Sequence, residues 1–105
     1  MTFSVNAALL DAMVLAVVAS EETYGYKITQ DLCEAVSVSE STLYPVLRRL
    51  QKGGYLNTYD KPFQGRNRRY YSITDEGSNS LNQLRQDWIV YRNNIERILG
   101  GISNG

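Results

Sequence analysis

The last quarter of this 105-residue chain carries apolar residues at alternating spacings of three and four. Such spacing is the heptad pattern of a helix that packs along another helix. A helix of about 24 residues spans roughly 36 Å, which would overhang the body of so short a chain. The pattern therefore predicts a terminal dimerisation helix with the interface residues Leu81, Leu84, Trp88, Tyr91, Ile95 and Ile98.

Packing of this helix on its own domain would give the same spacing, and this alternative stays open. It is disfavoured because the preceding residues already supply a core. Residues 7–19 are apolar nearly all round, as in a helix buried on several sides, and residues 27–35 place Ile28 and Leu32 on one helical face.

A third helix, ending near Lys52, has its apolar residues at helical spacing: Leu43, Val46, Leu47 and Leu50. Its candidate N-caps are Ser37, Ser39 and Ser41. Ser37 has capping-box spacing to Glu40. Pro45 lacks a backbone donor and is tolerated only near a first turn, which favours a later start.

Residues 55–60 and 69–73 are rich in Tyr, Thr and Ile, as strands are. The connector 61–68 contains Pro62, Gly65 and Asn67, which predicts a hairpin with a loose basic tip. Thr74 is a good N-cap for the last helix.

This element order predicts a mainly α fold with a minor β part. Residues 1–73 would form a winged helix-turn-helix DNA-binding domain with a two-stranded β-wing. Residues 74–105 would form the long C-terminal dimerisation helix and a flexible tail, with residues 100–105 frayed.

Positive charge is concentrated in one segment of this formally neutral chain. Seven of the eleven Lys and Arg residues lie between Ser41 and Thr74, with only one acidic residue, Asp60, so the segment carries about +6. A neutral protein that gathers its cations on one helix and one hairpin presents a surface for a polyanion.

The third helix supplies the first candidate DNA-binding residues, and in a helix-turn-helix it enters the major groove. Its hydroxyl side chains can bond to base edges or phosphates, and Arg48 reaches a guanine or a phosphate. The alternative is a solvated polar face, which the basic neighbouring elements disfavour. The residues are Ser41, Thr42, Tyr44, Pro45, Arg48, Arg49 and Lys52.

The wing supplies four more cations: Lys61, Arg66, Arg68 and Arg69. Such a wing lies along the DNA backbone or reaches into the minor groove, although a solvated turn is the alternative. Of its neighbours Tyr70 and Tyr71, one should pack on the core. The start of the second helix could bind a phosphate, unless its tyrosines are core aromatics. Its candidate residues are Tyr24, Tyr26 and Lys27.

Other function classes find little support. The chain has no His, its single cysteine Cys33 lies in an apolar stretch, and no metal-ligand spacing or phosphate-cradling loop occurs, so we expect no enzyme, cofactor or metal. The apolar run 9–19 is too short to cross a bilayer, which predicts a cytoplasmic protein without membrane contact.

A protein-protein interaction module on the same scaffold is the alternative function, although it gives no reason to concentrate Arg in the wing. RNA binding lacks a stacking platform.

The chain resembles the PadR family of transcriptional regulators, specifically its short-armed subfamily, from about Ala7 to Gly77 and more loosely through Leu99. The most specific matches are Tyr24-Gly25-Tyr26-Lys27-Ile28, the stretch from Ser41 to Leu50 with Leu43-Tyr44-Pro45, and Gly65 followed by Arg68 through Gly77.

The resemblance implies a homodimer that binds a pseudo-palindromic operator in double-stranded DNA and usually represses. It implies that the first and last helices form the dimer interface. It also implies a possible effector, a small planar aromatic ligand, in a cavity lined by a tryptophan that corresponds to Trp88. Plain dimer packing would explain Trp88 equally.

Overall fold

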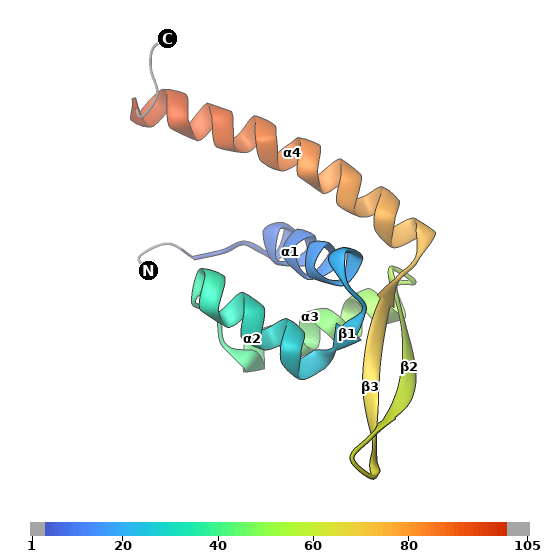
Figure 1. Cartoon of the computed structure of the whole chain (residues 1–105). Coiled ribbons are helices and arrows are strands. Elements are labelled where there is room, and N and C mark those ends of the chain that lie inside the picture. The colour runs from blue at the N-terminus through green and yellow to red at the C-terminus, as the bar shows by residue number, and fades with distance from the viewer. Residues whose placement is uncertain (1–3, 101–105) are drawn as a thin grey trace.

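The computed structural model describes residues 4–100 and contains four helices and three strands in that range (Figure 1). The elements are α1 (Ala7–Ser20), β1 (Thr23–Tyr24), α2 (Gly25–Val36), α3 (Glu40–Lys52), β2 (Leu56–Phe63), β3 (Arg66–Ile73) and α4 (Asp75–Leu99). The predicted tail lies outside the described residues, apart from Gly100.

The core lies where α1 meets α2, α3 and the base of the hairpin. As the sequence predicts, α1 is buried on several sides, and Val14 and Leu15 are fully enclosed. The apolar faces of α2 and α3 pack onto it through Ile28, Leu32, Leu43, Val46, Leu47 and Leu50. These contacts hold α3 at a fixed orientation, which leaves its other face free for a ligand.

Helix α3 begins earlier than Pro45 suggests. Ser39 is the N-cap, and its hydroxyl accepts a hydrogen bond from the Thr42 amide. The expected later start is wrong because this cap begins the helix six residues before Pro45. Ser41 and Pro45 are both exposed, so solvent can reach the Ser41 carbonyl that Pro45 leaves without a donor. Ser37 ends α2 in the left-handed conformation and does not cap α3.

The wing is longer and tighter than predicted. Strands β2 and β3 pair from Leu56 with Ile73 out to Phe63 with Arg66. The tip contains only Gln64 and Gly65, both with positive φ, as in a type I′ hairpin turn. The loose tip expected for residues 61–68 is therefore wrong, because those residues continue the ladder.

A third strand, which the sequence pattern did not predict, extends the sheet. The two-residue strand β1 pairs antiparallel with β3, so the sheet order is β1-β3-β2. Thr23 lies opposite Tyr71 and Tyr24 lies opposite Tyr70. This pairing attaches the base of the wing to the residue just before α2.

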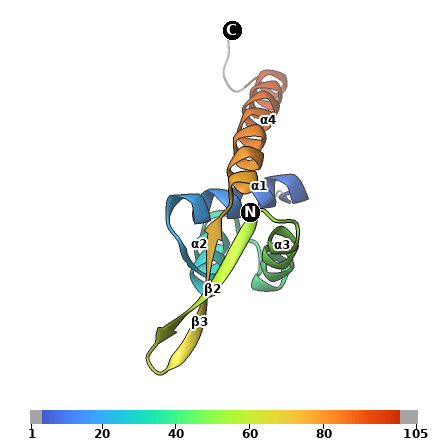
Figure 2. The same cartoon turned by 90° about the vertical axis from the view of Figure 1, so that its right-hand side faces the viewer.

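Helix α4 begins at the predicted cap. The Thr74 hydroxyl accepts from the Gly77 amide at 2.9 Å and donates to the Gly54 carbonyl at 2.7 Å. The helix continues for 25 residues and extends beyond the body of the protein (Figures 1 and 2). With this helix included, the molecule measures 57 × 29 × 19 Å. The expected overhang is confirmed.

The first turns of α4 nevertheless belong to the core. Leu81 is 3 % exposed and Leu84 packs against the same cluster as α1. The first residues of the predicted dimer interface are thus already covered within one chain. Own-domain packing, the alternative left open by the spacing, describes this part of the helix.

Replacing Gly77 by alanine should destabilise the fold. A methyl group there would overlap the Tyr55 carbonyl oxygen and lie 2.7 Å from Cγ1 of Ile73. Helix propensity alone favours alanine by about 1 kcal/mol, so a decrease in the free energy of unfolding would identify the steric clash. We expect a loss of about 2 kcal/mol in unfolding free energy by urea denaturation. The exposed control Asn79→Ala should change it little, and equal stability of both variants would contradict the close approach of Gly77 to Tyr55.

Candidate nucleic-acid interface

Helix α3 presents a polar face opposite its buried leucines. The exposed residues on this face are Ser41, Thr42, Pro45, Arg48 and Lys52, while Tyr44 is half-buried. The Ser39 hydroxyl lies 3.0 Å from both the Ser41 and the Thr42 hydroxyls. The first turn of α3 therefore displays a joined group of hydroxyls, which can donate and accept hydrogen bonds.

Arg49, predicted to contact DNA, is engaged within the chain. Its guanidinium forms a two-point ion pair with Asp11 of α1, at 2.6 Å and 3.2 Å. The hydrogen bond and then the charge of Asp11 raise the pKa of Arg49. Arg49 therefore ties α3 to α1, and no sequence pattern indicates a partner 38 residues away.

Arg68 of the wing is likewise held by neighbouring side chains. Its guanidinium carbon lies 3.9 Å from the ring centre of Tyr24 and 3.7 Å from that of Phe63. A cation between two aromatic faces is stabilised by both ring quadrupoles. This sandwich joins the wing to the residue that precedes α2.

A row of aromatic rings continues this contact along the sheet. Tyr70 packs edge-on against Tyr24, at 5.7 Å between centroids, and stacks on Tyr59 at 5.6 Å. The Tyr59 hydroxyl donates to Glu22 at 2.7 Å, and this hydrogen bond is the main cause that raises the pKa of Tyr59. The wing is therefore bound to the body along its base.

The remaining wing cations are more open. Lys61 lies over the Tyr70 ring at 5.2 Å. Arg69 is 3.9 Å from Asp60, a long contact between exposed groups that contributes little. Arg66, next to the turn, is exposed.

A surface hollow of about 760 Å³ joins α2, α3 and the wing. It brings together five predicted residues, which are Tyr24, Tyr26, Tyr44, Arg68 and Arg69. Lys27 is not among its lining residues, and the Lys27 ammonium is hydrogen-bonded to Asp31 at 3.0 Å. The hollow therefore gathers five of the fourteen residues predicted to bind DNA, and these five come from all three elements.

The hollow also contains residues that the sequence patterns did not single out as site residues: Gly25, Asp60, Asn67 and Tyr71. Alternation along β3 indicated that Tyr70 or Tyr71 packs inward, and Tyr71 is the buried one. Periodicity could not show that the buried ring also borders the hollow, because that depends on how β3 meets α2.

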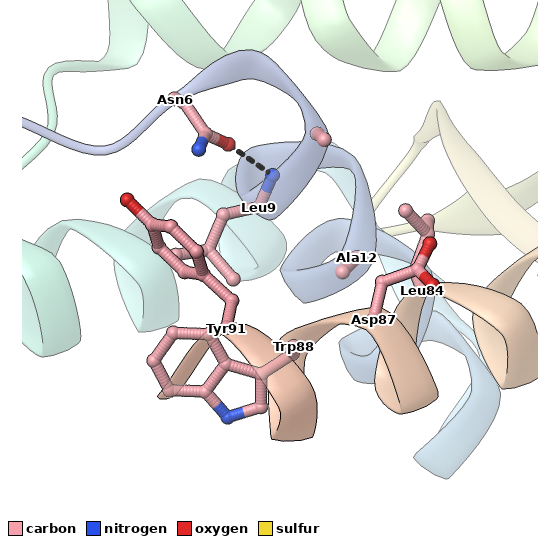
Figure 3. A pocket seen from close by; sticks show the side chains of 8 residues that line it. Asn6, Leu9, Ala12, Leu84, Asp87, Trp88 and Tyr91 are labelled. Carbon is pink, nitrogen blue, oxygen red and sulfur yellow. Dashed lines mark hydrogen bonds between the residues drawn. The ribbon is translucent and has the colours of Figure 1, made fainter. Parts of the chain in front are cut away.

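A second surface lies on the opposite side of the core, between α1 and α4. One groove of about 290 Å³ is lined by Leu9, Ala12, Leu84, Trp88 and Tyr91, with Asn6, Ala8 and Asp87 (Figure 3). Beyond it the apolar stripe of α4 is open to solvent, with Trp88 at 39 % exposed and Ile98 at 80 %. Tyr91 and Ile95 lie between them on the same stripe.

Two other kinds of site are not found between residues 4 and 100. That range contains no cluster of three His, Cys, Asp or Glu residues that could hold a metal ion. Nor does any helix in it combine the length and apolar character needed to span a membrane.

A three-helix core whose third helix faces outward beside a β-hairpin defines a winged helix-turn-helix protein. Residues 14–83 match the Transcriptional regulator PadR-like family. The chain is 34 % identical over 87 residues to a Mycobacterium tuberculosis protein named Transcriptional regulator Rv3488, covering 82 % of this chain and 78 % of that protein.

Solved structures agree with this match. The structure of smu.1704 from Streptococcus mutans superposes with a TM-score of 0.88 at 42 % identity and covers 100 % of both chains. A PadR-like transcriptional regulator from Bacillus cereus superposes with a TM-score of 0.79 at 32 % identity, covering 89 % of this chain and 93 % of that one. The chain belongs to the PadR-like family of transcriptional regulators, which are not enzymes.

Proposed function

We propose that this regulator is a homodimeric repressor that binds a pseudo-palindromic operator in double-stranded DNA. The observation that carries the proposal is the separation of two surfaces. Helix α3 and the wing lie on one side of α1, and α4 extends away on the other (Figure 1). The first two elements carry exposed basic residues, and α4 carries the open apolar stripe. Such a repressor works on chromosomal DNA in the cytoplasm.

In this proposal α3 enters the major groove with its first turn nearest the bases. The hydroxyls of Ser41 and Thr42 contact base edges or phosphates, and Arg48 follows one turn later. The wing lies along the flanking backbone with Arg66 at its tip. Two copies read half-sites about 34 Å apart.

The stripe of α4 supports the dimer. Trp88, Tyr91, Ile95 and Ile98 are exposed in the single chain and continue the heptad spacing. Exposed apolar side chains in a continuous row mark an interaction surface. A second copy of the same stripe is the partner that the spacing favours.

The groove between α1 and α4 supports an effector, a small planar aromatic compound. The rings of Trp88 and Tyr91, 6.4 Å apart, lie beside Leu9 and provide apolar surfaces for stacking (Figure 3). Since Asp11 links α1 to Arg49 of α3, a compound that shifts α1 would also shift the recognition helix. Binding would then change the population of the operator-binding arrangement.

The DNA-binding proposal predicts a steep salt dependence on an operator found by footprinting upstream of the chain's own gene. Each lost contact between a cationic side chain and a phosphate flattens the slope of log K against log salt by about 1. We therefore expect Arg48→Gln with Arg66→Gln to flatten the slope by about 2 in fluorescence anisotropy. The matched control Arg97→Gln removes a cation from α4 and should leave the slope unchanged. An unaltered slope in the double variant would refute the interface.

The dimer proposal predicts that Ile95→Asp with Ile98→Asp yields a folded monomer. Both side chains are exposed in the single chain, so the change should spare the core. Sedimentation velocity should show a dimer for the wild type and for Asn93→Asp, which adds a charge on the opposite side of α4. Operator affinity of the double variant should fall at least tenfold, because two linked heads are replaced by independent ones. A monomeric wild type would contradict the proposal.

The effector proposal predicts fluorescence quenching, because Trp88 is the only tryptophan. Planar aromatic compounds, cationic ones above all since Asp87 lines the groove, should quench Trp88 and weaken operator binding. Ala8→Met, which narrows the same groove, should reduce the quenching. The proposal fails if a broad panel of planar aromatic compounds leaves the fluorescence unchanged. It also fails if the fluorescence of Ala8→Met is quenched as strongly as that of the wild type.

A further inference from the structure

We infer that the hollow between α2, α3 and β3 binds one phosphodiester of the DNA backbone, held by the Tyr71 hydroxyl and the first turn of α2. The inference rests on the proposed DNA-binding function and names a contact that function does not by itself require. It makes Tyr71, a residue of the core, a direct ligand of DNA.

Tyr71 is buried yet has an unused hydroxyl. Its side chain is 7 % exposed and borders the hollow. Within residues 4–100 no hydrogen bond to this hydroxyl is found, although every fully enclosed side-chain oxygen and nitrogen there has a partner. The free hydroxyl must therefore reach the open surface of the hollow. Burial raises the pKa of Tyr71, so the phenol stays a proton donor at neutral pH.

The first turn of α2 lies beside this hydroxyl. The N-cap Tyr24 makes no side-chain hydrogen bond to the turn, whereas Ser39 and Thr74 cap α3 and α4. The amides at the start of α2 are thus available to an anion, and the helix dipole favours negative charge there.

Gly25, the first residue of α2, keeps this space open. A methyl group on Gly25 would lie 3.5 Å from Cε1 of Tyr44 and 3.6 Å from Cε1 of Tyr71. Those carbons adjoin the hydroxyl-bearing ring carbons, so the hydroxyl ends of both rings lie near the start of α2. The methyl group would make ordinary contacts with the protein, but it would occupy space that a phosphate oxygen needs.

The charges around the hollow are mostly positive. Arg69 and Arg48 both act on the Tyr71 phenol and oppose the rise of its pKa, so both are close to it. Asp60 also lines the hollow and lies 3.9 Å from Arg69, so it offsets part of the positive charge on the wing side. The anion is therefore best placed toward α2 and Tyr71, away from Asp60.

Two neutral substitutions test the site in the full-length protein on the footprinted operator. Tyr71→Phe removes only the hydroxyl, and Gly25→Ala fills the hollow without a clash. Each should lower operator affinity about tenfold, as expected for loss of a hydrogen bond to a charged group, without changing the salt slope. Unfolding free energies should stay close to that of the wild type. The control Tyr55→Phe changes an exposed tyrosine between α3 and β2, outside the hollow, and should bind normally.

Duplexes that each carry one uncharged methylphosphonate linkage locate the phosphate. The wild type should lose affinity at one particular linkage in each half-site, and Gly25→Ala should lose nothing further there, since the contact is already gone. If the wild type binds and both variants have the same affinity as the wild type for every duplex, this site is wrong while the proposed function stands. A wild type that binds no duplex would overturn the proposed function as well.

Discussion

The arrangement of the whole molecule depends on the hydrogen bonds of Thr74, where the sheet ends and α4 begins. The side chain of this residue bonds to both Gly54 and Gly77, and its amide donates to Tyr55 at 3.2 Å. A helix of 25 residues is about 37 Å long, so a small rotation at its first turn moves its far end by many ångströms. The direction of α4 relative to α3 and the wing is therefore set within a few residues.

The wing depends in a similar way on contacts at its base. A two-stranded hairpin alone is marginally stable in water, and this one gains a third strand, the stacked rings of Tyr59 and Tyr70, and the Arg68 sandwich. The third strand and the sandwich use Tyr24 and Arg68, two residues that the sequence alone assigns to DNA binding. Fixing the wing in advance lowers the conformational entropy that binding would otherwise cost.

Periodicity made most of the fold predictable, because the three core helices and α4 each repeat their apolar residues over many positions. β1 has only two residues, too few for any alternation to show, and its existence depends on the tertiary approach of β3. The contacts that Arg49 and Arg68 make within the chain could not be predicted from the sequence either. A long cation has many possible partners, and Asp11 and Tyr24 became those partners only through packing of elements that are distant in sequence.

Because the chain has no net charge, short-range contacts contribute a larger share of the binding energy to DNA. A strongly basic protein attracts DNA from a distance, but here a segment of about +6 is balanced by acidic residues elsewhere in the chain. Beyond the Debye length of about 8 Å at physiological salt these charges largely cancel. Binding energy must then come from short-range contacts, and in the proposed phosphate site a hydroxyl such as that of Tyr71 or a missing side chain at Gly25 matters as much as a further arginine.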